Sequence, residues 1–233
     1  ESLSSDVGDG YIEFIRELSL KCANNGIVLS VDNYVPTSYT AFYNRAEQAL
    51  FADYVVVMAY DEHYAGSEEA GPVASIGYVK EGVANTLKEV PADQIIMGMP
   101  FYTRVWIETP VSSDTTASET TDNAEASTEE VTVEDGSSDS YTLYELTTYA
   151  TNMSEIQNLI SANDATPVWS EEAGQNYVQY ENNGVIYKIW IEDALSLEEK
   201  LKVLQSNNLA GGSFWKLGLE NASVWDTIIK YIN

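Results

Sequence analysis

Apolar residues recur along the chain with two periods, one helical and one strand-like. Near the start they fall at helical spacing, at Tyr11, Phe14, Ile15, Leu18 and Cys22. Gly26 ends that run, as glycine commonly does after a helix. A segment rich in β-branched residues then predicts a strand over 26–36, and Ser38 is placed to cap a second helix. The inward positions of that second helix would be Tyr39, Phe42, Ala46 and Ala49.

Two continuous apolar runs predict strands that are covered on both faces. They span 54–60 and 95–102, and uninterrupted runs of this kind are typical of a parallel sheet. Further elements are expected at 75–88 (helix), 196–206 (helix), 210–215 (strand) and about 225–231 (helix). The chain therefore contains four strand–helix repeats, which indicates an α/β fold. Four parallel strands form either an open sheet or half of an eight-stranded barrel, and periodicity does not choose between them.

Two segments interrupt the alternation. Residues 109–140 form an acidic, Ser/Thr-rich, low-complexity insertion, which offers too little apolar surface to offset the entropy of ordering it. We expect this segment to lie on the surface without stable structure; it lacks the spacing of a calcium-binding loop. After a short helix near 154–162, the segments 177–180 and 185–190 alternate about Asn182-Asn183-Gly184 and predict a β-hairpin.

Charge and cysteine content narrow the classes of function. The formal net charge of −26 argues against nucleic acid and against anionic membrane surfaces as partners. The 109–140 insertion holds nine of the carboxylates, which leaves about −17 on the remainder. A single cysteine, Cys22, permits neither an internal disulfide nor a cysteine-built metal site. No apolar run is long enough to span a membrane. Because the chain opens at Glu1 without a methionine, we expect a piece of a longer protein.

Polar and aromatic residues stand where the predicted strands end, which is where function collects in parallel α/β folds. They are Tyr60, Asp61, Tyr102, Arg104 and Trp215. Aromatic rings offer flat surfaces to the C–H faces of sugars, while hydroxyl, carboxylate and guanidinium groups supply directed hydrogen bonds. These residues therefore predict a site for a carbohydrate or another polar ligand.

The strand ends carry three motifs, in the order Met58-Ala-Tyr60-Asp61, Gly98-Met-Pro-Phe-Tyr102-Thr-Arg104 and Ala210-Gly-Gly-Ser-Phe-Trp215. They resemble the sixth, seventh and eighth barrel strands of family 18 glycoside hydrolases, the chitinase-like family. Segments 59–63 and 71–77 most resemble its bacterial cell-wall and spore-cortex-lytic N-acetylglucosaminidase branch. The resemblance implies that residues 1–233 form one partial catalytic domain. That domain would be the C-terminal half, strands five to eight, of a (β/α)8 TIM barrel, with a small β-hairpin insertion before the last strand.

The resemblance also implies a general acid at the first residue. Glu1 lies ten residues before Tyr11, the spacing that this branch shows between the last glutamate of the signature Asp-x-x-Asp-x-Asp-x-Glu and the first helical aromatic. The chain departs from the family pattern here, because it does not contain the earlier acidic residues or the first four strands. By resemblance, Glu1 would protonate the leaving oxygen in a retaining, substrate-assisted hydrolysis.

The remaining roles are likewise carried over from the family. Tyr60 and Asp61 would hold the acetamido group and the distorted sugar, and Trp215 would form the floor beneath it. Met58, Tyr102 and Arg104 would complete the substrate-binding residues, although core packing is the alternative for Met58. Neither a metal nor an organic cofactor is needed. The partner would be an N-acetylglucosamine-containing glycan, with peptidoglycan or cortex favoured over chitin, at an extracellular, cell-wall or spore-associated location.

Two other functions stay open on the sequence: a non-catalytic, lectin-like carbohydrate-binding relative, and a scaffold protein. The pocket aromatics oppose the scaffold. Outside the site, His63 is expected to be a hydrogen-bonded loop residue, and Glu192 with Asp193 a solvated pair. The hairpin aromatics are expected to cap the barrel rim, with sugar contact as the alternative; they are Tyr177, Tyr180, Tyr187 and Trp190.

Overall fold

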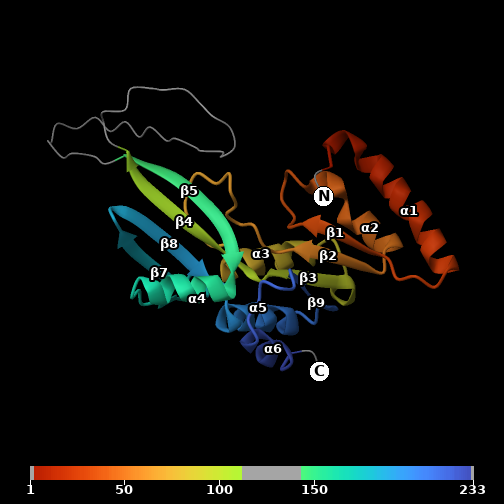
Figure 1. Cartoon of the computed structure of the whole chain (residues 1–233). Coiled ribbons are helices and arrows are strands. Elements are labelled where there is room, and N and C mark those ends of the chain that lie inside the picture. The colour runs from red at the N-terminus through yellow and green to blue at the C-terminus, as the bar shows by residue number, and fades with distance from the viewer. Residues whose placement is uncertain (1–2, 112–142, 232–233) are drawn as a thin grey trace.

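The computed structural model describes residues 3–111 and 143–231, which form two sheets (Figure 1). The first is parallel, with strand order β1-β2-β3-β9. Its members are β1 (Ser30–Tyr34), β2 (Tyr54–Met58), β3 (Ile95–Pro100) and β9 (Gly211–Trp215). All three pairings are parallel. The four expected strand units of an α/β fold are therefore present, and within the described residues they form an open sheet rather than a closed barrel.

Helices pack against one face of the parallel sheet. They are α1 (Gly8–Asn24), α2 (Arg45–Phe51), α3 (Ile76–Thr86), α5 (Ala194–Ser206) and α6 (Ser223–Ile228), with short 3-10 helices η1 (Ser5–Val7), η2 (Ala41–Tyr43) and η3 (Ala92–Gln94). Alternate strand residues such as Val55, Val57 and Met97 are fully buried in the core shared with these helices. On the other face Asp32 is exposed, and Val56 is only partly buried. The core therefore lies on the helical side of the sheet.

The second sheet is antiparallel, with strand order β5-β4-β8-β7-β6. Its members are β4 (Tyr102–Val111), β5 (Leu143–Asn152), β6 (Val168–Ser170), β7 (Gln175–Asn182) and β8 (Val185–Ile191). Helix α4 (Met153–Ala162) packs on one of its faces. There Ile156 of the helix joins Val105, Val178 and Ile189 in a small core of its own. In Figure 1 this sheet extends away from the parallel sheet.

The antiparallel sheet is therefore larger than the small β-hairpin that the sequence predicted. The predicted hairpin exists as β7 and β8, with Tyr180 opposite Tyr187, but β4 and β5 add two long strands. They pair along ten positions, from Tyr102 opposite Asn152 to Val111 opposite Leu143. Thr109, Pro110 and Val111 thus belong to β4 rather than to the insertion expected over 109–140, whose other residues lie outside the described residues. The mixed polar composition of β5 gives no strand-like alternation. The strand is therefore recognisable only from its pairing with β4.

The second helix also differs from the expectation. It begins at Arg45, and its cap is Asn44 rather than Ser38: the Asn44 side chain accepts a hydrogen bond from the Glu47 amide at 3.3 Å. Tyr39, expected inward, is 89% exposed. Asn44 has a φ of 48°, in the left-handed region that asparagine tolerates better than most residues. The chain therefore turns sharply after η2, and the helix starts later than the apolar spacing suggested.

Candidate active site

The strand ends meet at one edge of the parallel sheet because of its register. Tyr34 lies opposite Met58, Met58 opposite Gly98, and Pro100 opposite Trp215. A cavity of about 220 Å³ opens at this edge. Its lining residues are Tyr34, Met58, Tyr60, Asp61, Tyr102 and Trp215. Five of the residues expected at the site therefore come together, and Tyr34 joins them.

Asp61 and Tyr102 form the central polar pair of the cavity. The Tyr102 hydroxyl donates a hydrogen bond to the Asp61 carboxylate. Burial of Tyr102 raises the pKa of its phenol, and the hydrogen bond to Asp61 raises it further. Tyr102 is thus a protonated donor at any physiological pH. Asp61 has a φ of 59°, a left-handed conformation that is costly for a non-glycine residue and that clusters at functional sites.

The loop after Asp61 is fixed by hydrogen bonds. The Glu62 carboxylate accepts from the Ser75 amide at 2.6 Å and from its hydroxyl at 3.0 Å. His63 Nδ1 lies 2.9 Å from the Pro72 carbonyl oxygen, which confirms that His63 is a hydrogen-bonded loop residue. A Cβ at Gly71 would stand 2.4 Å from the His63 ring. This close packing returns the chain to the start of α3 and holds Asp61 at the cavity.

The Tyr60 ring stands beside that of Tyr102, edge to face, with ring centroids 6.3 Å apart. Its position depends on the absence of a side chain at Gly98. A Cβ there would lie 3.2 Å from Tyr60 Cε1 and 3.0 Å from the Val57 carbonyl oxygen. The glycine of the second motif therefore makes room for the tyrosine of the first.

Trp215 and Arg104 extend the cavity toward the second sheet. A neighbouring cavity of about 280 Å³ is lined by Asp61, Tyr102, Arg104, Ala150, Thr151, Trp215 and Leu219. The two cavities share three residues and so meet. Trp215 is 55% exposed, and its carbonyl accepts from the Phe101 amide at 2.7 Å. An open indole face beside hydrogen-bonding groups is suited to stacking on a sugar ring.

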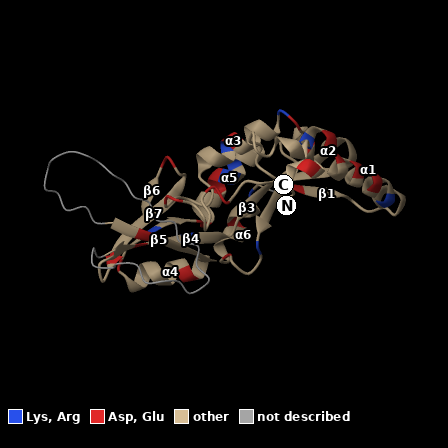
Figure 2. Cartoon of the chain, turned by 90° about the horizontal axis from the view of Figure 1, so that it is seen from above, with Lys and Arg blue, Asp and Glu red and all other residues tan. Residues whose placement is uncertain are grey.

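Arg104 supplies the cationic group of this double cavity. Its guanidinium carbon lies 5.9 Å from the centre of the Trp106 ring. Among the described residues, its buried Nε has no hydrogen-bond partner. Asp61 is the one acidic residue among those lining the two cavities, and Arg104 the one basic residue. In Figure 2 acidic positions lie along helices such as α1. The lining is therefore balanced in charge and suits an uncharged polar ligand.

Comparison with known proteins places this arrangement in a family. Residues 3–220 match the family model for glycosyl hydrolases family 18. The chain belongs to this family. It is 27% identical over 227 residues to the cortical fragment-lytic enzyme of Bacillus subtilis, covering 93% of this chain and 44% of that protein. This family 18 chain spans about half the length of the curated relatives that it matches.

Solved structures share the fold of this family 18 chain. The chitinase of Chromobacterium violaceum superposes with a TM-score of 0.78 at 19% identity, covering 100% of this chain and 64% of that one. The spore cortex-lytic enzyme SleL of Bacillus megaterium superposes with a TM-score of 0.75 at 20% identity, covering 99% of this chain and 47% of that one. At these identities the likeness establishes the fold, while the position of each residue comes from the geometry above.

A third cavity lies on the antiparallel sheet of the family 18 chain. It measures about 560 Å³ and is lined by Glu68, Glu69, Ala70, Glu108, Tyr144, Leu146, Tyr177, Gln179, Lys188 and Trp190. The Tyr177 and Trp190 rings lie 4.7 Å apart. Tyr180 and Tyr187 stack at 4.8 Å on the face that packs against α4. The hairpin aromatics thus divide between the two faces of the sheet.

The expectation of a solvated Glu192–Asp193 pair was wrong. Glu192 is fully buried and ion-paired at 2.9 Å with Lys200, which is also buried. It accepts further hydrogen bonds from Ser196 at 2.7 Å and Gln175 at 2.7 Å. Burial raises the pKa of Glu192, and Lys200 opposes that rise. Asp193 caps α5. Lys200 lies on α5 whereas Glu192 precedes that helix, so no local sequence pattern predicts that the two side chains pair.

Two residues, Glu1 and Tyr34, set the candidate site apart from the site predicted by the sequence. Glu1 lies outside the described residues. Tyr34, which the sequence reasoning missed, ends β1 just as Met58 ends β2, so the rule used for the other strand ends would have found it.

In the described part of the chain there is no cluster of three or more His, Cys, Asp or Glu able to hold a metal ion. Of the helices described, none is long and apolar enough to cross a membrane.

Proposed function

We propose that the protein carrying this chain is a glycosidase that cleaves β-linked N-acetylglucosamine polymers by retaining, substrate-assisted catalysis. The observation that carries the proposal is the cavity in which Tyr60 and the Asp61–Tyr102 pair stand beside the exposed face of Trp215. Membership of family 18 supports it. A flat aromatic floor with a carboxylate and a protonated phenol at its edge matches the needs of an N-acetylated sugar.

In the proposed mechanism the substrate supplies its own nucleophile. The acetamido oxygen attacks the anomeric carbon while Glu1 donates a proton to the leaving oxygen. Tyr60 and Asp61 hold the acetamido group as it becomes a positively charged oxazolinium ion, which a carboxylate stabilises electrostatically. The Tyr102 hydroxyl fixes the orientation of Asp61. Glu1 then removes a proton from a water molecule, and that water attacks the anomeric carbon. The attack opens the oxazolinium ring and gives a product with the anomeric configuration of the substrate.

We infer that the chain forms the C-terminal half of a (β/α)8 barrel. Parallel sheets are normally covered on both faces, whereas this one leaves Asp32 exposed and Val56 and Ile96 only partly buried on the side where the described residues form no helix. Four preceding strands would cover that side. The relatives, about twice as long as this chain, have room for them. Barrel closure would turn the open edge around Tyr60 and Trp215 into a cleft.

Peptidoglycan or spore cortex is the favoured substrate, with chitin as the second candidate. The cortical fragment-lytic enzyme among the relatives supports cortex, and a matching Drosophila melanogaster protein bears the name "Probable chitinase 10". By the same argument the protein would act outside the cytoplasm, at the cell wall or the spore.

The test is hydrolysis by the full-length protein of cortex peptidoglycan and of chitin, with the anomeric form of the first product followed by NMR. We expect release of reducing ends with the β-configuration retained. Glu1→Gln should lower turnover of unactivated glycan by about 10²–10⁴-fold, the usual contribution of general acid–base catalysis, while glycan binding survives. Binding without any hydrolysis by the wild type would instead favour the lectin-like alternative.

A further inference from the structure

Among the aromatic residues that line the cavity, Tyr34 is the one that the predicted site did not include. It ends β1 opposite Met58, and its side chain lines the cavity that Trp215 also lines. It is 38% exposed, so part of its ring faces the open space. Its ring contacts the buried Tyr43 ring edge to face, with centroids 6.2 Å apart. The Tyr34 ring thus packs against Tyr43 on one side and is exposed to the cavity on another.

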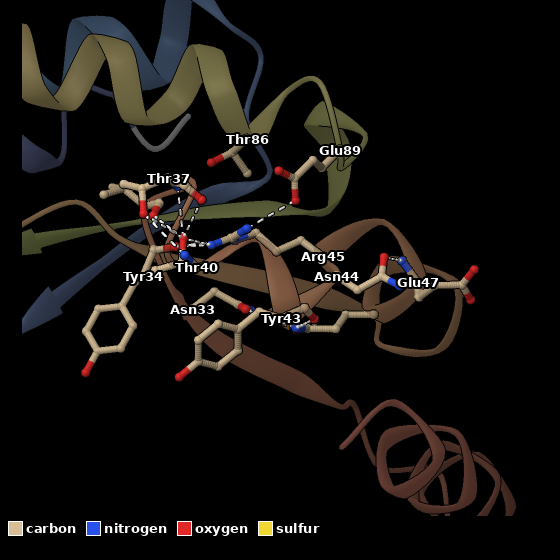
Figure 3. A network of polar contacts seen from close by, with 12 residues as sticks. Asn33, Tyr34, Thr37, Thr40, Tyr43, Asn44, Arg45, Glu47, Thr86 and Glu89 are labelled. Carbon is tan, nitrogen blue, oxygen red and sulfur yellow. Dashed lines mark hydrogen bonds and ion pairs between the residues drawn. The ribbon is translucent and has the colours of Figure 1, made fainter. Parts of the chain in front are cut away.

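The backbone of Tyr34 is held by a buried cation. The Arg45 guanidinium is fully buried, and its Nε and Nη2 donate to the Tyr34 carbonyl oxygen at 3.3 and 3.1 Å (Figure 3). Nη2 also donates to Thr40 Oγ1 at 2.7 Å, and Nη1 pairs with Glu89 at 3.2 Å. A buried guanidinium costs folding energy unless its donors are satisfied, and two of its donors are directed at the Tyr34 carbonyl.

The residues on both sides of Tyr34 are anchored as well. Thr40 Oγ1 donates to the Val35 carbonyl oxygen at 3.1 Å, which ties down the chain just after Tyr34. Just before it, the buried Asn33 side chain exchanges hydrogen bonds with Gln48 at 2.8 and 3.0 Å. Fixing a contact residue before the ligand arrives reduces the entropy lost on binding.

Tyr34 and Trp215 stand on the two outermost strands of the parallel sheet. Two strands lie between them, and neighbouring strands are about 4.8 Å apart. The two rings are therefore placed to contact different parts of a ligand that lies across the strand ends.

We propose that Tyr34 is a further substrate-contacting residue, which binds the N-acetylhexosamine unit next to the one on Trp215, and that Arg45 is its positioning residue. This inference rests on the proposed glycan-binding function. It adds a contact that depends on ligand length, because a single sugar on Trp215 does not reach Tyr34.

The test uses titration calorimetry on the full-length protein with sulfur-linked, non-hydrolysable N-acetylglucosamine oligomers. Tyr34→Ala should weaken binding of the tetramer about tenfold, in the range expected for one aromatic contact, and should change binding of the single sugar less than twofold. Tyr34→Phe keeps the ring and should bind within about twofold of the wild type. Tyr39→Ala is the matched control, because Tyr39 is 89% exposed and lines none of the cavities described above. Tetramer binding by Tyr34→Ala within twofold of the wild type would overturn the inference.

A double-mutant comparison tests the positioning role of Arg45. Arg45→Lys keeps the charge but loses the planar fork of donors, so it should weaken tetramer binding in the wild type yet add no further loss in Tyr34→Ala. Equal losses in both backgrounds would show that Arg45 acts on the whole fold instead. If Arg45→Lys does not fold, Thr40→Val removes the neighbouring hydroxyl and should give the same pattern more weakly.

The outcomes separate this inference from the proposed catalysis. A wild type that binds the tetramer but hydrolyses no glycan would refute the catalysis, and the Tyr34 measurements would still decide the contact. A wild type that hydrolyses glycan while Tyr34→Ala binds normally would refute the contact alone. A wild type that neither binds nor hydrolyses any of these glycans would overturn both.

Discussion

Lys200 and Arg45 are both buried cations, yet their surroundings differ. Lys200 Nζ lies 3.0 and 2.9 Å from the two carboxylate oxygens of Glu192, and both side chains are buried completely. Arg45 instead pairs at 3.2 Å with Glu89, which is 32% exposed, and directs most of its donors at neutral oxygens. Lys200 therefore depends on a single buried anion. Arg45 donates to several acceptors, and the one anion among them is partly exposed to solvent.

The two clusters also serve different parts of the molecule. Glu192 follows β8, and its amide donates to Thr103 Oγ1 at 2.9 Å. Because Lys200 lies on α5, this pair joins the antiparallel sheet to a helix of the parallel sheet, and Thr103 stands between Tyr102 and Arg104. Arg45 holds Tyr34 at the other side of the cavity. The comparison suggests that the first cluster mainly sets stability and the second mainly sets binding.

The largest expected effect follows from removing Lys200. Lys200→Met leaves Glu192 buried without its counter-ion and should lower the free energy of unfolding by about 3–5 kcal/mol. The double variant Glu192→Leu/Lys200→Met should recover most of that loss, because no buried charge remains. Urea unfolding of the full-length protein measures both. A single variant as stable as the double would show that the ion pair is not the cause.

The effect of pH should separate the two clusters. In the folded protein the pKa of Glu192 is raised above its ordinary value of 4.5 by burial, so folding favours the protonated form. Its contribution to stability is complete below pH 4.5 and is lost as the pH rises through the folded pKa. Glu192→Gln should therefore gain stability relative to the wild type over that rise. Arg45→Lys leaves Glu192 in place, so its difference in stability from the wild type should show no such trend. Unfolding curves measured from pH 4 to about pH 8 test this prediction. A difference in unfolding free energy between Glu192→Gln and the wild type that stayed constant over this range would contradict it.

The smallest expected effect concerns the exposed partner of Arg45. Glu89→Gln removes a partly solvated carboxylate while the neutral acceptors of Arg45 remain, so we expect a change below about 1 kcal/mol in unfolding free energy. Thermal melts of the full-length protein measure it. A loss as large as that of Lys200→Met would mean that Arg45 depends on one anion after all, and the contrast between the clusters would disappear.

What the sequence predicted well depends on local pattern. The buried strands were visible because a parallel strand is apolar on both faces, as Val55 and Val56 of β2 are. The strand-end residues converge because parallel strands end at one edge, which brought Tyr60 and Trp215 into one cavity. Local pattern therefore predicted the parallel sheet and most of the residues that line the candidate site.

What the sequence did not predict depends on distant partners. Strand β5 is recognisable only through its pairing with β4 across a long intervening segment. The burial of Glu192 depends on Lys200, which lies on another element. The anchoring of Tyr34 depends on Arg45 and Glu89, which approach from separate helical and loop segments. Such pairings follow from tertiary packing, which no periodicity records.

The role of Asp61 at this cavity is tested most directly by the turnover rate of Asp61→Asn in the full-length protein on an N-acetylglucosamine polymer. The proposed mechanism predicts a fall in kcat of about 10²–10³-fold, the usual cost of losing one group that stabilises developing charge, with glycan affinity nearly unchanged. Asp226→Asn, an exposed residue of α6 away from the cavities, should turn over at the wild-type rate. An Asp61→Asn protein with a kcat within twofold of the wild type would contradict the placement of the active site at this cavity.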